Sequence, residues 1–137
     1  DAPMARLYRE APLNGIWEGS SNMVALDVFR AAEREVGSLE AVLAEIDTVR
    51  GADAAIDRGL ASLKDALADK GNWEFGARRL VERMAILWQA ALLRQHAPAA
   101  VADAFVASRL AGDNGPLFGR LTDPAGAQTI IERALAN

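Results

Sequence analysis

The chain has 137 residues, of which 51% are hydrophobic and 25% charged, with a formal net charge of −4 and no cysteine. This length allows one substantial hydrophobic core but is short for two ordinary domains, and the negative charge disfavours the broad basic surface that binding to a phosphate backbone requires. The lack of cysteine excludes disulfides and thiolate chemistry and agrees with a cytoplasmic location, and no apolar run approaches the roughly 18 to 20 residues needed to span a bilayer.

Helices are favoured from the start of the chain, because Ala and Leu dominate while β-branched and aromatic residues are sparse. A short helix is predicted over 5–10, and Pro, Asn and Gly within 12–15 predict a loop after it. Polar side chains at 20–22 can cap a following helix, whose apolar stripe continues to about Glu35. Glu18 is therefore expected immediately before a helix N-terminus.

The middle of the chain contains three predicted helices. Apolar spacing predicts one over 38–49, with Gly51 at its end, and another over 52–69. Asn72 is placed to cap the helix over 73–95, which is the longest. Because the apolar residues of that helix cover more than one face, it is expected to be central and buried on two sides.

The last part of the chain predicts two more helices. Pro98 suits the first turn of a helix that ends near Gly112, and a turn-rich stretch over 113–123 precedes a helix over 125–136. Five to six helices joined by short loops, without a strand pattern, predict an all-α fold, namely a helical bundle. His96, the single histidine, stands at a helix end, where a role as dipole partner is favoured over catalysis.

Residues 6–22 read RLYREAPLNGIWEGSSN. This stretch resembles the signature of acyl-CoA dehydrogenases, in which an arginine-acid pair precedes an aromatic-Glu-Gly-Thr/Ser element. The segments over 104–110, 118–119 and 131–134 resemble the additional helical domain of the branch related to the DNA alkylation-response and isovaleryl-CoA dehydrogenase-like flavoproteins. The resemblance implies α,β-dehydrogenation of an acyl-CoA thioester by an FAD-dependent oxidoreductase.

The resemblance also implies roles for five residues. Glu18 corresponds to the general base that removes the α-proton of the substrate. Its backbone N–H, together with Gly19, would contact the thioester. Ser20, Ser21 and Asn22 would contact FAD, since free N–H groups at the positive end of a helix suit an anionic or polarised group.

The resemblance divides the chain at residue 34. Residues 1–34 match the end of the family's catalytic helical domain, and 35–137 would form an additional C-terminal helical domain. Trp17 stands where many members have tyrosine, and Ser20 where many have threonine, which keeps an aromatic wall and a hydroxyl.

The chain opens without an initiator Met and lacks the N-terminal helical and middle β-domains. It is therefore expected to be a piece of a longer protein, inactive alone and unable to hold FAD tightly.

Two other functions remain open on sequence grounds. The first is a non-catalytic helical module that assembles the parent into a homo-oligomer, a dimer or tetramer, because the long helix has an excess of apolar residues and the upstream domains are missing. Trp73, Phe75 and Trp88 in that helix suit a core or an interface. The second is nucleic-acid binding through the arginines of the helix between Arg78 and Arg94. Of the 15 basic and 19 acidic residues, 4 and 5 lie in 1–34, which leaves 11 and 14 beyond it. This balance disfavours nucleic acid as a partner.

Overall fold

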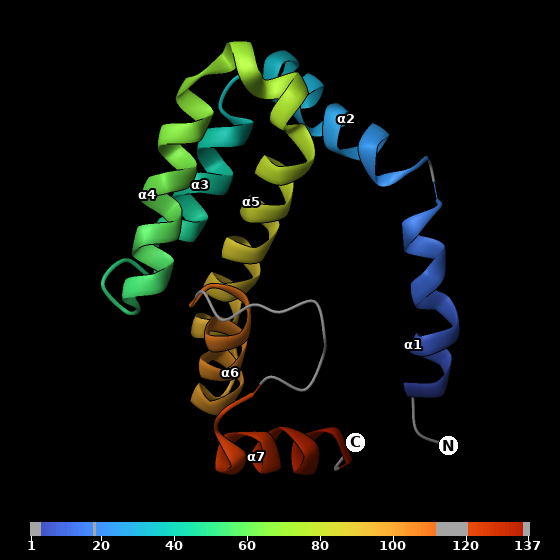
Figure 1. Cartoon of the computed structure of the whole chain (residues 1–137), viewed down its shortest axis with the longest axis vertical. Helices are drawn as coiled ribbons and strands as arrows, with labels where there is room; N and C mark the ends of the chain where they lie inside the picture. Colours follow the sequence, from blue (N-terminus) through green and yellow to red (C-terminus); the bar gives the residue numbers. More distant parts are fainter. Residues whose placement is uncertain (1–3, 18, 112–120, 136–137) are drawn as a thin grey trace.

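The structure, a computed structural model, describes residues 4–17, 19–111 and 121–135, and these form helices without a strand (Figure 1). The all-α fold predicted from the sequence is confirmed. The described residues contain seven α-helices where the sequence predicted five to six, and two 3-10 helices join them. The helices are α1 (Met4–Glu10), η1 (Ala11–Gly15), α2 (Ser21–Arg34), α3 (Ser38–Asp47), α4 (Ala54–Ala68), η2 (Lys70–Asn72), α5 (Trp73–His96), α6 (Ala99–Arg109) and α7 (Pro124–Leu135).

The helix α5 is the centre of the molecule, as its apolar pattern predicted. It packs against α2, α3, α4 and α6, while α7 lies against α6 (Figure 1). Burial of apolar side chains from these helices is the main source of stability. The core side chains are Ala25, Phe29, Ile46, Val49, Ile56, Leu60, Leu63, Leu67, Trp73, Ala77, Leu80, Met84, Leu87, Ala90, Ala91 and Val106.

Trp73 fixes the first turn of α5 against two other elements. Its ring lies 4.8 Å from that of Phe29 on α2, measured between centroids. The indole Nε1–H donates a 3.0 Å hydrogen bond to the carbonyl oxygen of Leu67 at the end of α4. Because a buried indole N–H needs an acceptor, this hydrogen bond allows Trp73 to be buried without an unpaired donor.

The helices α4 and α5 approach each other closely at Gly59. A Cβ atom at this position would lie 2.7 Å from Cδ2 of Leu87, which is fully buried. Real side chains do not tolerate such a distance, so the glycine sets how near the two helices can come. At Gly76 on α5 the nearest neighbour, Leu80 Cδ1, would be at an ordinary 3.4 Å.

Arg94 connects three helices near the C-terminal end of α5. Its guanidinium donates to Asp53, which precedes α4, at 2.6 Å and to Asp103 on α6 at 2.5 Å. The Asp53 carboxylate also caps α4, accepting from the Ala55 N–H at 2.8 Å. Burial opposes ionisation of Asp53, but the hydrogen bonds from Ala55 and Arg94 outweigh it and lower the pKa of this carboxyl.

One local prediction, the capping of α5 by Asn72, was wrong. Asn72 precedes α5 but makes no capping hydrogen bond, because its side-chain amide donates to the Asp69 carboxylate at 2.6 Å instead. Phe75, predicted to lie in the core or at an interface, is 97% exposed and so lies outside the core. Trp88 is also exposed, unlike Trp73 on the same helix.

The N-terminal arm, defined as residues 4–17, lies apart from this core. Figure 1 shows α1 separated from α5 and α6, and none of the residues in α1 or η1 is buried. Several apolar side chains of the arm are instead exposed, namely Met4, Leu7, Tyr8, Leu13, Ile16 and Trp17. Among the described residues, therefore, nothing covers the apolar side of the arm.

Candidate active-site bend

The chain bends between the N-terminal arm and α2, at the position of the family motif. The N–H groups of Ile16 and Trp17 donate to the Leu13 carbonyl at 3.0 and 2.8 Å, and the Gly19 N–H donates to the Ile16 carbonyl at 3.4 Å. Glu18, the predicted general base, lies outside the described residues. The bend is therefore defined by the residues on either side of it.

Gly19 is the residue that permits this bend. Its φ is +118°, a conformation that residues with a side chain rarely adopt. A Cβ atom there would also lie 3.3 Å from Cβ of Met23 on α2. The sequence reading assigned Gly19 to close approach of a substrate, and the backbone conformation is a second, structural reason for glycine at this position.

The N-terminus of α2 follows directly. Ser20 is extended, with φ −70° and ψ 160°, and its carbonyl accepts the first helical hydrogen bond from the Val24 N–H at 3.2 Å. The Ser20 hydroxyl makes no capping hydrogen bond, and Ser21 and Asn22 are exposed in the first turn. The described residues thus provide no side-chain cap, which leaves first-turn N–H groups available to an anionic or polarised group.

Apolar side chains surround the bend. Trp17 is 64% exposed and Ile16 is 73% exposed, and Met23 and Val24 at the start of α2 are exposed as well. A contiguous group of exposed apolar residues is typical of a surface that contacts another protein segment or a ligand. The sequence motif identified Trp17 as an aromatic wall but did not indicate the neighbouring apolar residues of α2.

Other predicted features can be located within the described parts of the chain. His96 is the last residue of α5 and is exposed, as expected for a residue at a helix C-terminus. In residues 4–17, 19–111 and 121–135, no three His, Cys, Asp or Glu side chains are grouped as a metal site would require. No helix among them is both long enough and apolar enough to cross a bilayer.

The all-α architecture is consistent with the C-terminal helical part of an acyl-CoA dehydrogenase. The chain is 31% identical over 105 residues to the Escherichia coli (strain K12) protein named "Putative acyl-CoA dehydrogenase AidB". This match covers 77% of the chain and confirms its relationship to acyl-CoA dehydrogenase-like proteins.

The match is nevertheless partial with respect to the relative. The chain spans only 19% of the length of that protein. No family model matches the chain, and no solved structure matches it. The relationship therefore shows that the chain belongs to the acyl-CoA dehydrogenase-like family.

Proposed function

We propose that the chain is the C-terminal helical part of an FAD-dependent acyl-CoA dehydrogenase-like oxidoreductase, with Glu18 as the general base for α,β-dehydrogenation of an acyl-CoA thioester. The observation that carries the proposal is the bend itself. A left-handed Gly19 and an uncapped α2 stand beside the motif glutamate, and the sequence relationship to an acyl-CoA dehydrogenase-like protein covers most of the chain.

The residues around the bend suit the proposed chemistry. A general base must reach its proton and be partly removed from water, so that its pKa moves toward the working pH. The exposed Trp17 ring provides apolar surface at the residue that precedes Glu18 in the sequence. The Glu18 N–H and Gly19 would lie against the thioester and polarise its carbonyl. FAD, when bound, supplies the hydride acceptor.

The open N-terminus of α2 fits a cofactor that carries negative or polarised groups. Ser20, Ser21 and Asn22 would hold FAD through their N–H groups and side chains, since the described residues leave the first turn without a cap. Acyl-CoA and FAD are thus the proposed partners of the parent protein, and its proposed location is the cytoplasm.

The exposed arm supports the proposal that the chain works only as part of a longer polypeptide. The apolar residues of α1 and η1 have no buried position among the described residues. We assign residues 1–34 to the end of the catalytic helical domain and 35–137 to an additional helical domain. Ala25 and Phe29 nevertheless pack into the same core as the later helices, so this boundary separates family segments and not two hydrophobic cores.

The role of Glu18 is tested in the full-length parent protein. Glu18→Gln is expected to leave FAD bound while abolishing flavin bleaching by an acyl-CoA under anaerobic conditions. Glu33→Gln, an exposed change on α2, serves as the matched control and should bleach normally. Undiminished bleaching by the Glu18 variant would contradict the proposal, as would equal loss in the control.

The exposed apolar arm also favours a second function, a non-catalytic module that assembles the parent into a dimer or tetramer. Light scattering on the 137-residue chain tests this alternative. A concentration-dependent dimer that dissociates on Ile16→Ser would support it, whereas a monomer at high concentration would oppose it. Bleaching that depends on Glu18 would show that the module is not merely structural.

A further inference from the structure

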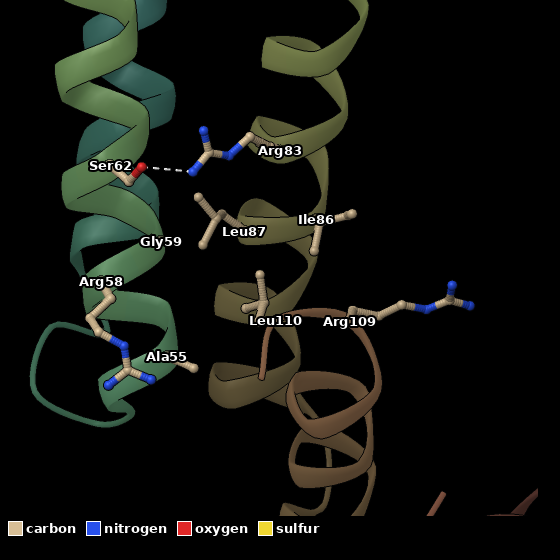
Figure 2. Close-up of a pocket in the computed structure, with 9 residues that line it drawn as sticks. All are labelled: Ala55, Arg58, Gly59, Ser62, Arg83, Ile86, Leu87, Arg109 and Leu110. Carbon is tan, nitrogen blue, oxygen red and sulfur yellow. Dashed lines mark hydrogen bonds between the residues drawn. The ribbon is translucent and has the colours of Figure 1, made fainter. Parts of the chain in front are cut away.

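A second surface, far from the bend in sequence, combines apolar and positively charged residues. It is a groove of about 330 Å³ between α4, α5 and the end of α6. Ile86, Leu87 and Leu110 form its apolar part. In Figure 2, Leu87 and Leu110 lie in the space between the helices α4 and α5.

Among the described residues, the charged side chains that line this groove are arginines. Arg58, Arg83 and Arg109 contribute from α4, α5 and α6. The chain as a whole is acidic, with a net charge of −4, and Arg30 and Arg50 pair with neighbouring aspartates, whereas Arg58 and Arg83 form no ion pair within the described residues. The groove is thus a local positive region on an acidic protein.

Arg83 is the best placed of these arginines to bind an anion. It is partly buried and reaches across the groove from α5, donating from Nη2 to the Ser62 hydroxyl at 2.8 Å (Figure 2). Ser62 orients the guanidinium without neutralising it. Within the described residues, no carboxylate forms an ion pair with Arg83 or Arg58, so both retain donors for a ligand.

The chemistry of the groove defines the class of ligand. A guanidinium binds a carboxylate through two parallel hydrogen bonds, and its partial burial strengthens that contact. The adjacent leucines favour an aliphatic chain over further polar groups. The groove volume is near the lower end of the roughly 300 to 1,000 Å³ typical of small-molecule pockets, which excludes a long aliphatic chain.

We infer that this groove binds a medium-chain monocarboxylate, with the carboxylate at Arg83 and the aliphatic chain against Leu110, above the buried Leu87. Arg58 contributes a second, more exposed positive charge at the opening. A ligand recognised only by its charge, such as the phosphate backbone of a nucleic acid, would make no use of the apolar part.

The inference is tested with octanoate as the probe, by NMR titration of the 137-residue chain. Octanoate is expected to shift the amide resonances of 58–62, 83–87 and 110, and to leave those of α2 unchanged. Octanol, which has the chain without the charge, and inorganic phosphate, which has charge without the chain, are each expected to bind at least about tenfold more weakly. Equal binding of either compound would overturn the inference.

Variants distinguish binding of octanoate in the groove from attraction to positive charge elsewhere on the chain. Arg83→Gln should weaken octanoate binding about tenfold or more, and Arg58→Gln, an exposed change that spares the fold, about threefold. Arg78→Gln removes the same charge from α5 outside the groove and should have no effect. Retention of affinity in both groove variants, or equal loss in the Arg78 control, would show that octanoate does not bind at this site.

Discussion

Replacing Arg94 with alanine is expected to destabilise the bundle strongly, because three helices meet at this guanidinium. Asp53 and Arg94 have side-chain exposures of only 17% and 18%, so the loss of their hydrogen bond leaves a largely buried carboxylate without its charged partner. Hydrogen bonds to charged groups contribute about 1.5 to 3 kcal/mol each. Asp103 is 61% exposed, and its bond adds about 1 kcal/mol or less. The sum is about 2 to 4 kcal/mol.

Urea denaturation of the 137-residue chain, followed by circular dichroism, measures this loss. Arg50→Ala is the matched control, because Arg50 pairs with Asp47 at 2.7 Å but is 69% exposed. The control should lose under about 1 kcal/mol. A double-mutant cycle with Asp53→Asn, which can keep the capping oxygen, isolates the interaction between the two charges. If Arg94→Ala costs no more than Arg50→Ala, the reasoning from burial is wrong.

Two further predictions concern pH and helix packing. The pKa of Asp53 is lowered below its ordinary value of 3.8, so its ionised form adds stability that is complete above that value and is lost as the pH falls through the folded pKa. The stability difference between wild type and Asp53→Asn, measured by urea titration, should therefore shrink below about pH 4. A difference that stays constant with pH would contradict this prediction. Gly59→Ala should destabilise the folded protein by about 1 to 2 kcal/mol through the clash with Leu87. Gly76→Ala, where there is room for a methyl group, should stabilise it by about 0.5 to 1 kcal/mol. Thermal unfolding of both variants measures these opposite effects.

The helices could be predicted from the sequence because their apolar residues recur with the helical period. The predicted central helix over 73–95 is α5. The predicted helix over 38–49 is α3, which ends at Asp47, and Gly51 lies four residues beyond it with φ +82°. Contacts between distant residues could not be predicted in this way. Arg94 and Asp53 are 41 positions apart, and their pairing depends on how α4 and α5 pack. Asn72 failed as a cap because Asp69, three residues earlier, competes for its side chain.

The candidate sites differ in the same respect. The segment around Glu18 was predicted as a site from one continuous motif, and the left-handed Gly19 follows it in the chain. The arginine groove could not be identified, since its residues come from three helices and each arginine alone resembles an ordinary surface residue. A groove of this kind requires the packed structure before its charge and apolar area can be seen together.

The separation of α1 from the core has a consequence for how its order is maintained. A helix of seven residues is far below the roughly 12 to 15 residues at which isolated helices become even marginally stable in water. Because α1 has no buried side chains of its own, its helicity is expected to depend on a partner surface that shields Leu7 and its apolar neighbours. Amide hydrogen exchange over 4–10 would then report whether α1 is bound to a partner surface. Exchange is expected to be slow when that surface is present and rapid when it is removed.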